Sequence, residues 1–139
     1  MRRENLRKRF LVILADRKKA RFFTIFMGSF EGESEEIPLE NVPQKIKAEG
    51  FRPGKISRHI REHLLGHLKN VGQKAWEFLV RRKIRQLDGV FIGTHKELFS
   101  TLKNHLPTRL KQKVLGEFVI KPNAALGDIT TRIITQFNL

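Results

Sequence analysis

Three histidines spaced four residues apart are the first residues in this sequence whose types and spacing suggest chemistry. His59, His63 and His67 would form a row along one side of a helix. Two histidines at this spacing can bind a metal ion, but Ile60 stands where a zinc-protease pattern needs a glutamate. The row also lies at the margin of an apolar stripe. Packing and hydrogen bonding are therefore favoured, and we expect neither a metal nor a cofactor.

Two aspartates lie next to predicted strands. Nucleases of the ribonuclease H kind use several carboxylates at strand ends to hold magnesium. Asp16 follows the first predicted strand, whereas Asp88 precedes the fourth. In parallel strands these positions fall at opposite ends, and no third carboxylate is placed to help. We interpret Asp16 as a turn residue and assign no catalytic residue.

Glycine patterns for phosphate binding are weak. Gly93-Thr94-His95 lies between a predicted strand and a predicted helix and could form a phosphate-binding turn. An ordinary turn in which Thr94 caps the helix is the preferred interpretation. Neither a Gly-x-Gly-x-x-Gly nor a Walker pattern is present.

The stretch from Gln44 to Arg85 has the most pronounced charge imbalance. It holds twelve Lys and Arg residues against three Glu, in a chain with a formal net charge of +14. This imbalance favours a polyanionic partner over a merely solvated helix face. The residues predicted to contact phosphates are Lys45, Lys47, Arg52, Lys55, Arg58, Arg61 and Lys69.

A loop that bears glycine and proline precedes the longest helical pattern. Its notable residues are Glu49, Gly50, Phe51 and Gly54. The glycines would let the loop adapt to a partner. Phe51 could stack on a base or fold back onto the domain, and the sequence leaves both open.

Length and composition describe a globular protein. The chain has 139 residues, 40% hydrophobic and 30% charged, which predicts a single domain, 1–139, with a basic N-terminal arm over residues 1–9. There is no cysteine, so disulfides and thiolate chemistry are excluded. The +14 charge is compatible with nucleic acid or an anionic membrane surface. No run approaches the roughly 20 apolar residues of a membrane span, so a cytoplasmic protein without a membrane partner is expected.

Periodicity predicts the order β-β-β-α-β-α-β-α, a mixed sheet covered by helices. A long helix should run from Ile56 to about Arg85 with an apolar stripe, and the glutamates between Glu31 and Glu40 should form an exposed, solubilising strand pair. The predicted strands are 10–15, 20–28, 37–42, 89–93 and 114–120; the further helices are 96–106, a turn or two over 108–113, and 123–137.

The chain resembles the middle domain of the archaeal and eukaryotic peptide-chain release factor and Pelota superfamily. It looks closest to a small bacterial single-domain branch that includes host-attachment-protein-like members. The resemblance covers nearly the whole chain. It rests on Leu11 to Asp16, Ala20 to Phe23, Arg58-His59, His63, His67-Leu68-Lys69, Gly89 to Gly93, Leu106-Pro107 and Val114 to Glu117.

The resemblance implies a three-layer α/β/α sandwich of the ribonuclease H-like kind, with a mixed five-stranded sheet. It also implies an encounter with the ribosome, through ribosomal RNA or tRNA. Release factors carry Gly-Gly-Gln in the loop before the long helix, whereas the matching residues here are Glu49-Gly50-Phe51. The resemblance therefore implies a binding domain without peptidyl-tRNA hydrolysis. The alternatives are a retained ester hydrolase, in translation release or ribosome rescue, and a protein-interaction module that docks a partner or a second copy.

Overall fold

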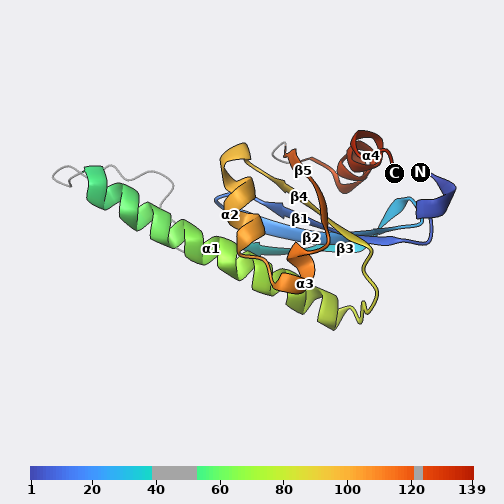
Figure 1. Ribbon diagram of the computed structural model, residues 1–139, viewed down its shortest axis with the longest axis horizontal. Helices are drawn as coiled ribbons and strands as arrows, with labels where there is room; N and C mark the ends of the chain where they lie inside the picture. The colour runs from blue at the N-terminus through green and yellow to red at the C-terminus, as the bar shows by residue number, and fades with distance from the viewer. Residues whose placement is uncertain (39–52, 121–123) are drawn as a thin grey trace.

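The computed structural model is a five-stranded mixed sheet with helices on both faces (Figure 1). It describes the backbone of residues 1–38, 53–120 and 124–139, and within these ranges the side chains of all residues except 33–35, 37, 38 and 53–60. The strands are β1 (Arg9–Ala15), β2 (Lys19–Phe26), β3 (Ser29–Pro38), β4 (Gly89–Thr94) and β5 (Val114–Val119). The helices are η1 (Arg3–Asn5), α1 (Pro53–Arg81), η2 (Lys96–Leu98), α2 (Phe99–Asn104), α3 (Thr108–Lys111) and α4 (Leu126–Gln136).

The sheet has the strand order β3-β2-β1-β4-β5. Strand β1 pairs antiparallel with β2 and parallel with β4, which in turn pairs parallel with β5. The carboxyl ends of β1, β4 and β5 therefore lie at the same edge of the sheet. The predicted element order and the mixed five-stranded sheet are confirmed.

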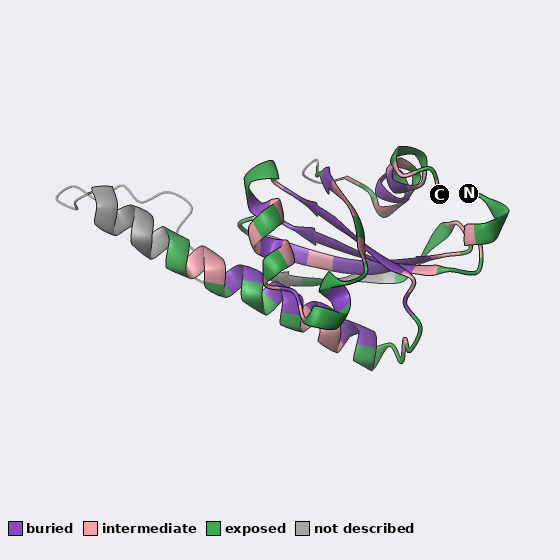
Figure 2. Ribbon diagram, in the orientation of Figure 1, coloured by how far each residue is buried: buried purple, intermediate pink, exposed green. Residues whose placement is uncertain are grey.

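Apolar cores cover both faces of the sheet (Figure 2). Strand β1 is buried from Phe10 to Ala15, because it lies in the centre and its alternating side chains enter both cores. Leu11 and Ile13 pack with α1, α2 and α3, whereas Val12 and Leu14 pack with α4. This arrangement confirms the three-layer α/β/α sandwich.

The predicted position of the third strand, residues 37–42, is wrong. Strand β3 begins at Ser29, in a segment predicted as a polar loop or strand start, and ends at Pro38. Met27 and Gly28, predicted to continue the second strand, instead form a two-residue turn with φ of 57° and 80°. Positive φ at both positions is typical of hairpin turns. The edge position that Pro38 requires is confirmed, and residues 39–42 lie outside the described part.

The acidic strand is more than a solubilising surface. The Glu31 carboxylate accepts hydrogen bonds from Arg9 at 2.9 and 3.0 Å and from the Thr24 hydroxyl at 2.7 Å. Glu36 is exposed and pairs with Lys19 at 3.2 Å. The prediction of an exposed strand pair is thus wrong for Glu31, because a sequence pattern does not show cross-strand partners.

The two chain ends lie beside each other (Figure 1). The Arg2 amide and the Asn5 side chain both donate hydrogen bonds to the Leu139 carbonyl oxygen. The basic arm therefore includes the short helix η1 and contacts Leu139, beyond the end of α4. No helix in the described part of the chain is long and apolar enough to span a membrane.

Candidate nucleic-acid interface and a basic crevice

Helix α1 is anchored by only part of its length. Its buried side chains Leu68, Val71, Ala75, Phe78 and Leu79 follow the predicted apolar stripe and pack on the sheet. The 29-residue helix is about 43 Å long, and its N-terminal part runs past the edge of the sheet (Figure 1). The sheet therefore anchors only the C-terminal part of α1.

The helix begins earlier than the sequence predicts. Pro53 occupies its first position, where a missing amide hydrogen loses no hydrogen bond and φ is already suitable. Gly54, expected in the loop, belongs to α1, as do Lys55 and Arg58. The helix ends at Arg81 rather than Arg85, because Lys83 adopts a positive φ of 56°.

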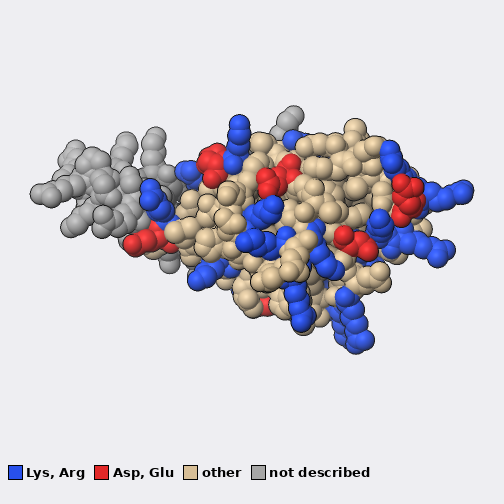
Figure 3. Space-filling view, in the orientation of Figure 1, with Lys and Arg blue, Asp and Glu red and all other residues tan. Residues whose placement is uncertain are grey.

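Two of the seven predicted phosphate-binding side chains can be placed. Arg61 and Lys69 are both exposed on α1 and lie about 12 Å apart along its axis. Lys55 and Arg58 have a described backbone but no described side chain. The other predicted residues, Lys45, Lys47, Glu49, Gly50, Phe51 and Arg52, lie outside the described residues. Figure 3 shows Lys and Arg side chains spread across one face of the described molecule.

The histidine row has a packing role at His67. This side chain is 6% exposed, and its Nε2–H donates a hydrogen bond of 3.1 Å to the Asp16 carbonyl oxygen. Burial lowers the pKa of His67, which favours the neutral imidazole. His63 is half-buried, and the side chain of His59 lies outside the described set. Among the described side chains, no three His, Cys, Asp or Glu residues gather as metal ligands would.

The two aspartates lie at opposite ends of the sheet, as the parallel pairing of β1 with β4 requires. Asp16 Oδ1 accepts hydrogen bonds from the Lys18 and Lys19 amides at 2.6 and 2.7 Å, so it shapes the turn between β1 and β2. Asp88 Oδ2 accepts from the Arg9 amide at 2.9 Å. Their separation matches the sequence-based expectation, and Asp16 is a turn residue.

Thr94 does not cap a helix. Its side chain is fully buried, and its hydroxyl has no hydrogen-bond partner among the described residues. His95 instead occupies the N-cap position of η2, without a side-chain capping bond. The predicted Thr94 cap is therefore wrong, because β4 continues one residue further than the sequence indicates.

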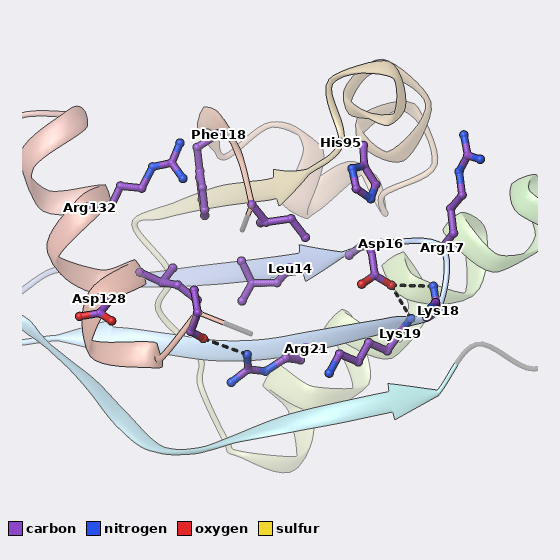
Figure 4. Close-up of a pocket in the computed structure, with 14 residues that line it drawn as sticks. Leu14, Asp16, Arg17, Lys18, Lys19, Arg21, His95, Phe118, Asp128 and Arg132 are labelled. Carbon is purple, nitrogen blue, oxygen red and sulfur yellow. Dashed lines mark hydrogen bonds between the residues drawn. The ribbon is translucent and has the colours of Figure 1, made fainter. Parts of the chain in front are cut away.

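A basic crevice that the sequence did not reveal opens at the carboxyl edge of the sheet (Figure 4). It has a volume of about 1020 Å³ and lies between the 16–19 turn, His95 and α4. Its basic lining residues are Arg17, Lys18, Lys19, Arg21 and Arg132. The sequence shows only that Arg17, Lys18 and Lys19 are adjacent. Arg132 joins them in the lining because of the position of α4 on the sheet.

Comparisons with known proteins agree with this architecture. Residues 5–138 match the model of the family described as "Bacterial archaeo-eukaryotic release factor family 10". The archaeal translation termination factor aRF1 has a similar solved structure, with a TM-score of 0.58 and 17% identity over 94% of this chain. A structure titled only "Archaeal protein" gives a TM-score of 0.56 and 16% identity over 92% of this chain. This chain covers 39% and 34% of those two proteins, respectively. No curated protein matches the sequence.

Proposed function

Since the chain belongs to the bacterial archaeo-eukaryotic release factor family 10, we propose that it is a non-catalytic domain that binds the ribosome through RNA. The main supporting observation is the overhang of α1, a basic helix that runs beyond the sheet that anchors it. A helix with exposed cations can approach RNA phosphates by charge and shape without reading bases.

The charge distribution supports an RNA partner. Arg61 and Lys69 are exposed on this helix. The further cations between Gln44 and Arg58 precede them in the sequence or occupy the first turns of α1. Contacts with about six phosphates would lower affinity by about a thousandfold between about 50 and 200 mM salt. In this proposal residues 1–139 act as one unit.

The loop residues favour binding without hydrolysis. A Gly-Gly-Gln loop positions water at the peptidyl-tRNA ester, according to the family resemblance. The corresponding residues of this chain, Glu49-Gly50-Phe51, retain one glycine and lack the glutamine. We expect ribosome binding without release of peptide.

Sedimentation with ribosomes and separated subunits over a salt series tests the proposal. Binding should disappear with rising salt and be lost when Arg52, Lys55, Arg58 and Arg61 are all changed to Glu. A matched variant reverses four exposed cations elsewhere, Arg3, Lys8, Lys96 and Lys111, and should retain most of the binding.

Three outcomes would overturn the proposal. Binding that survives the α1 reversal would exclude this helix as the RNA contact. Absence of binding at low salt, together with a defined dimer, would favour a protein-interaction module. Peptide release from stalled ribosomes that is lost in Gly50→Ala would show that the protein is a hydrolase.

A further inference from the structure

The basic crevice lies where open α/β sheets commonly bind ligands, outside the carboxyl ends of parallel strands. Asp16 follows β1, His95 follows β4 and Ile120 follows β5, and all three residues line the crevice. The opposite wall is the first turn of α4 with Asp128 and Ile129. The crevice is therefore formed by four separate segments of the chain.

Three lining cations retain donors for an anion. Lys18 is exposed and has no ion pair among the described residues. Arg21 donates one hydrogen bond to the Ala124 carbonyl oxygen, and Arg132 donates one to that of Val119. A guanidinium carries five N–H groups, so most of the donors of both arginines remain available. The other two cations, Arg17 and Lys19, have partners in Glu97 and Glu36.

The acidic residues of the lining do not cancel this charge. The lining contains two acidic residues, Asp16 and Asp128. The Asp16 carboxylate accepts hydrogen bonds from two amides of its own turn. With five cations against two carboxylates, the formal charge of the lining is +3 before His95 is counted. A mono- or dianionic ligand is favoured by such a balance.

The floor of the crevice is apolar. Leu14, Ile120 and Ile129 contribute to it, and the Arg132 side chain extends toward the Phe118 ring (Figure 4). The Arg132 guanidinium carbon is 5.4 Å from the centre of that ring. A guanidinium held in this way offers a flat surface on which a nucleobase can stack. Gly93 makes room for this floor, because a Cβ there would come within 2.7 Å of the Phe118 ring.

We propose that this crevice binds a nucleotide. The phosphate lies between Lys18 and Arg21, and the base lies over the apolar floor beside Arg132. Asp128 accepts a hydrogen bond from a ribose hydroxyl. The volume of about 1020 Å³ accommodates a mononucleotide. This site is separate from the overhang of α1, and the proposal does not depend on ribosome binding.

Titration of the isolated ¹⁵N-labelled protein with adenosine 5′-monophosphate tests this site without any ribosome. Amide shifts should concentrate at Arg17 to Arg21, His95 and the first turns of α4. Inorganic phosphate should bind more weakly and leave the α4 amides unshifted. Lys18→Glu removes a charged hydrogen bond to the phosphate, and Arg132→Gln removes the flat surface beside the base, so each should weaken binding about tenfold or more.

Lys111→Glu changes the same charge on the exposed surface of α3 and should leave the affinity unchanged. Thermal melting establishes that each variant is folded. If Arg132→Gln fails to fold, Lys18→Glu alone tests the site, because the Lys18 side chain has no ion pair among the described residues whose loss would destabilise the fold. No shifts at millimolar nucleotide, or binding that Lys18→Glu and Arg132→Gln leave intact, would overturn the proposal.

Competition identifies the source of the nucleotide. Displacement of the mononucleotide by a short oligoadenylate would identify an RNA end as the ligand. Retention of the mononucleotide in the presence of excess oligoadenylate would identify a free nucleotide. Both results support a nucleotide site, and a ribosome-binding defect in the α1 reversal variant would affect neither.

Discussion

The Glu31 carboxylate of β3 accepts hydrogen bonds from Thr24 on the adjacent strand β2 and from Arg9 on β1, the strand beyond it. The hydrogen bond from Arg9 lowers the pKa of Glu31, and the same contact raises the pKa of Arg9. Because the folded-state pKa of Glu31 is lowered, its ionised form stabilises the fold above the ordinary value of 4.5. That stabilisation is lost as the pH falls through the folded-state pKa.

Replacement of Glu31 by Gln should lower the free energy of unfolding by about 1 kcal/mol at pH 7. The difference from the wild type should shrink as the pH falls below 4.5, since the wild-type carboxyl is then protonated as well. Urea denaturation at pH 7 and pH 3 measures both values. Glu4→Gln is a matched control, because Glu4 is exposed and lies 3.7 Å from Arg2. A constant difference at both pH values would contradict the prediction.

The burial of His67 leads us to predict a second dependence of folding stability on pH. Its pKa is lowered by burial, so protonation is easier in the unfolded chain than in the folded one. Its contribution to stability is complete above the unfolded pKa and is lost as the pH falls below about 6.5. In His67→Gln, which can still donate to the Asp16 carbonyl, the fall in stability between about pH 7.5 and 5.5 should be smaller. If the free energy of unfolding falls equally with pH in the wild type and in His67→Gln, His67 is not the source of that fall.

At the scale of elements, two glycines in α1 have opposite surroundings. A Cβ on Gly72 would come within 2.9 Å of the His105 backbone oxygen and 3.2 Å of Pro107 Cδ. Gly66 is exposed, and a Cβ there would meet nothing within 4 Å. The segment after α2 therefore approaches α1 closely only because residue 72 has no side chain.

The two alanine variants should have opposite effects. Gly66→Ala should stabilise the protein by about 0.5–1 kcal/mol through helix propensity. Gly72→Ala should destabilise it by about 1–2 kcal/mol, since overpacking against backbone outweighs the same propensity gain. Thermal melting of both variants gives the sign directly. A rise in melting temperature for Gly72→Ala would show that α1 and the segment at His105 separate easily.

The elements were predictable to different degrees. The strands β1 and β4 are continuous apolar runs, and α1 has a regular stripe, so periodicity located all three. Strand β3 was missed over its first residues because glutamates alternate there with small residues and the strand lies at an edge. Thr94 was misassigned because strand and cap positions differ by a single residue, which sequence reasoning does not resolve.

At the scale of the whole molecule, the formal charge of +14 and the overhang of α1 predict a salt-dependent association. Each phosphate contact contributes about 0.7–0.9 to the slope of log affinity against log salt. The double change Arg61→Gln and Lys69→Gln should reduce that slope by about 1.4–1.8. Ribosome sedimentation over a salt series measures it.

The matched double variant is Lys96→Gln and Lys111→Gln, which removes two exposed cations from η2 and α3. Its slope should equal that of the wild type. Equal reductions in both double variants would mean that net charge, and not the position on α1, determines the association.

The candidate sites differ in what the sequence could reveal. The basic α1 was visible because its cations are close together in the chain. The crevice was not, because Arg21 and Arg132 are more than one hundred residues apart in the sequence and line the same crevice only through the placement of α4 on the sheet. Linear charge counting finds the first kind of site and misses the second.

The hydrogen bond from His67 to the Asp16 carbonyl joins α1 to the turn that lines the crevice. Two binding events on one chain are linked thermodynamically, and the linkage is reciprocal. If a nucleotide in the crevice changes the affinity of α1 for the ribosome by some factor, the ribosome changes the affinity for the nucleotide by the same factor. A nucleotide bound in the crevice would then raise or lower the fraction of the protein bound to the ribosome, and ribosome binding would change the fraction of crevices that hold a nucleotide in the same direction.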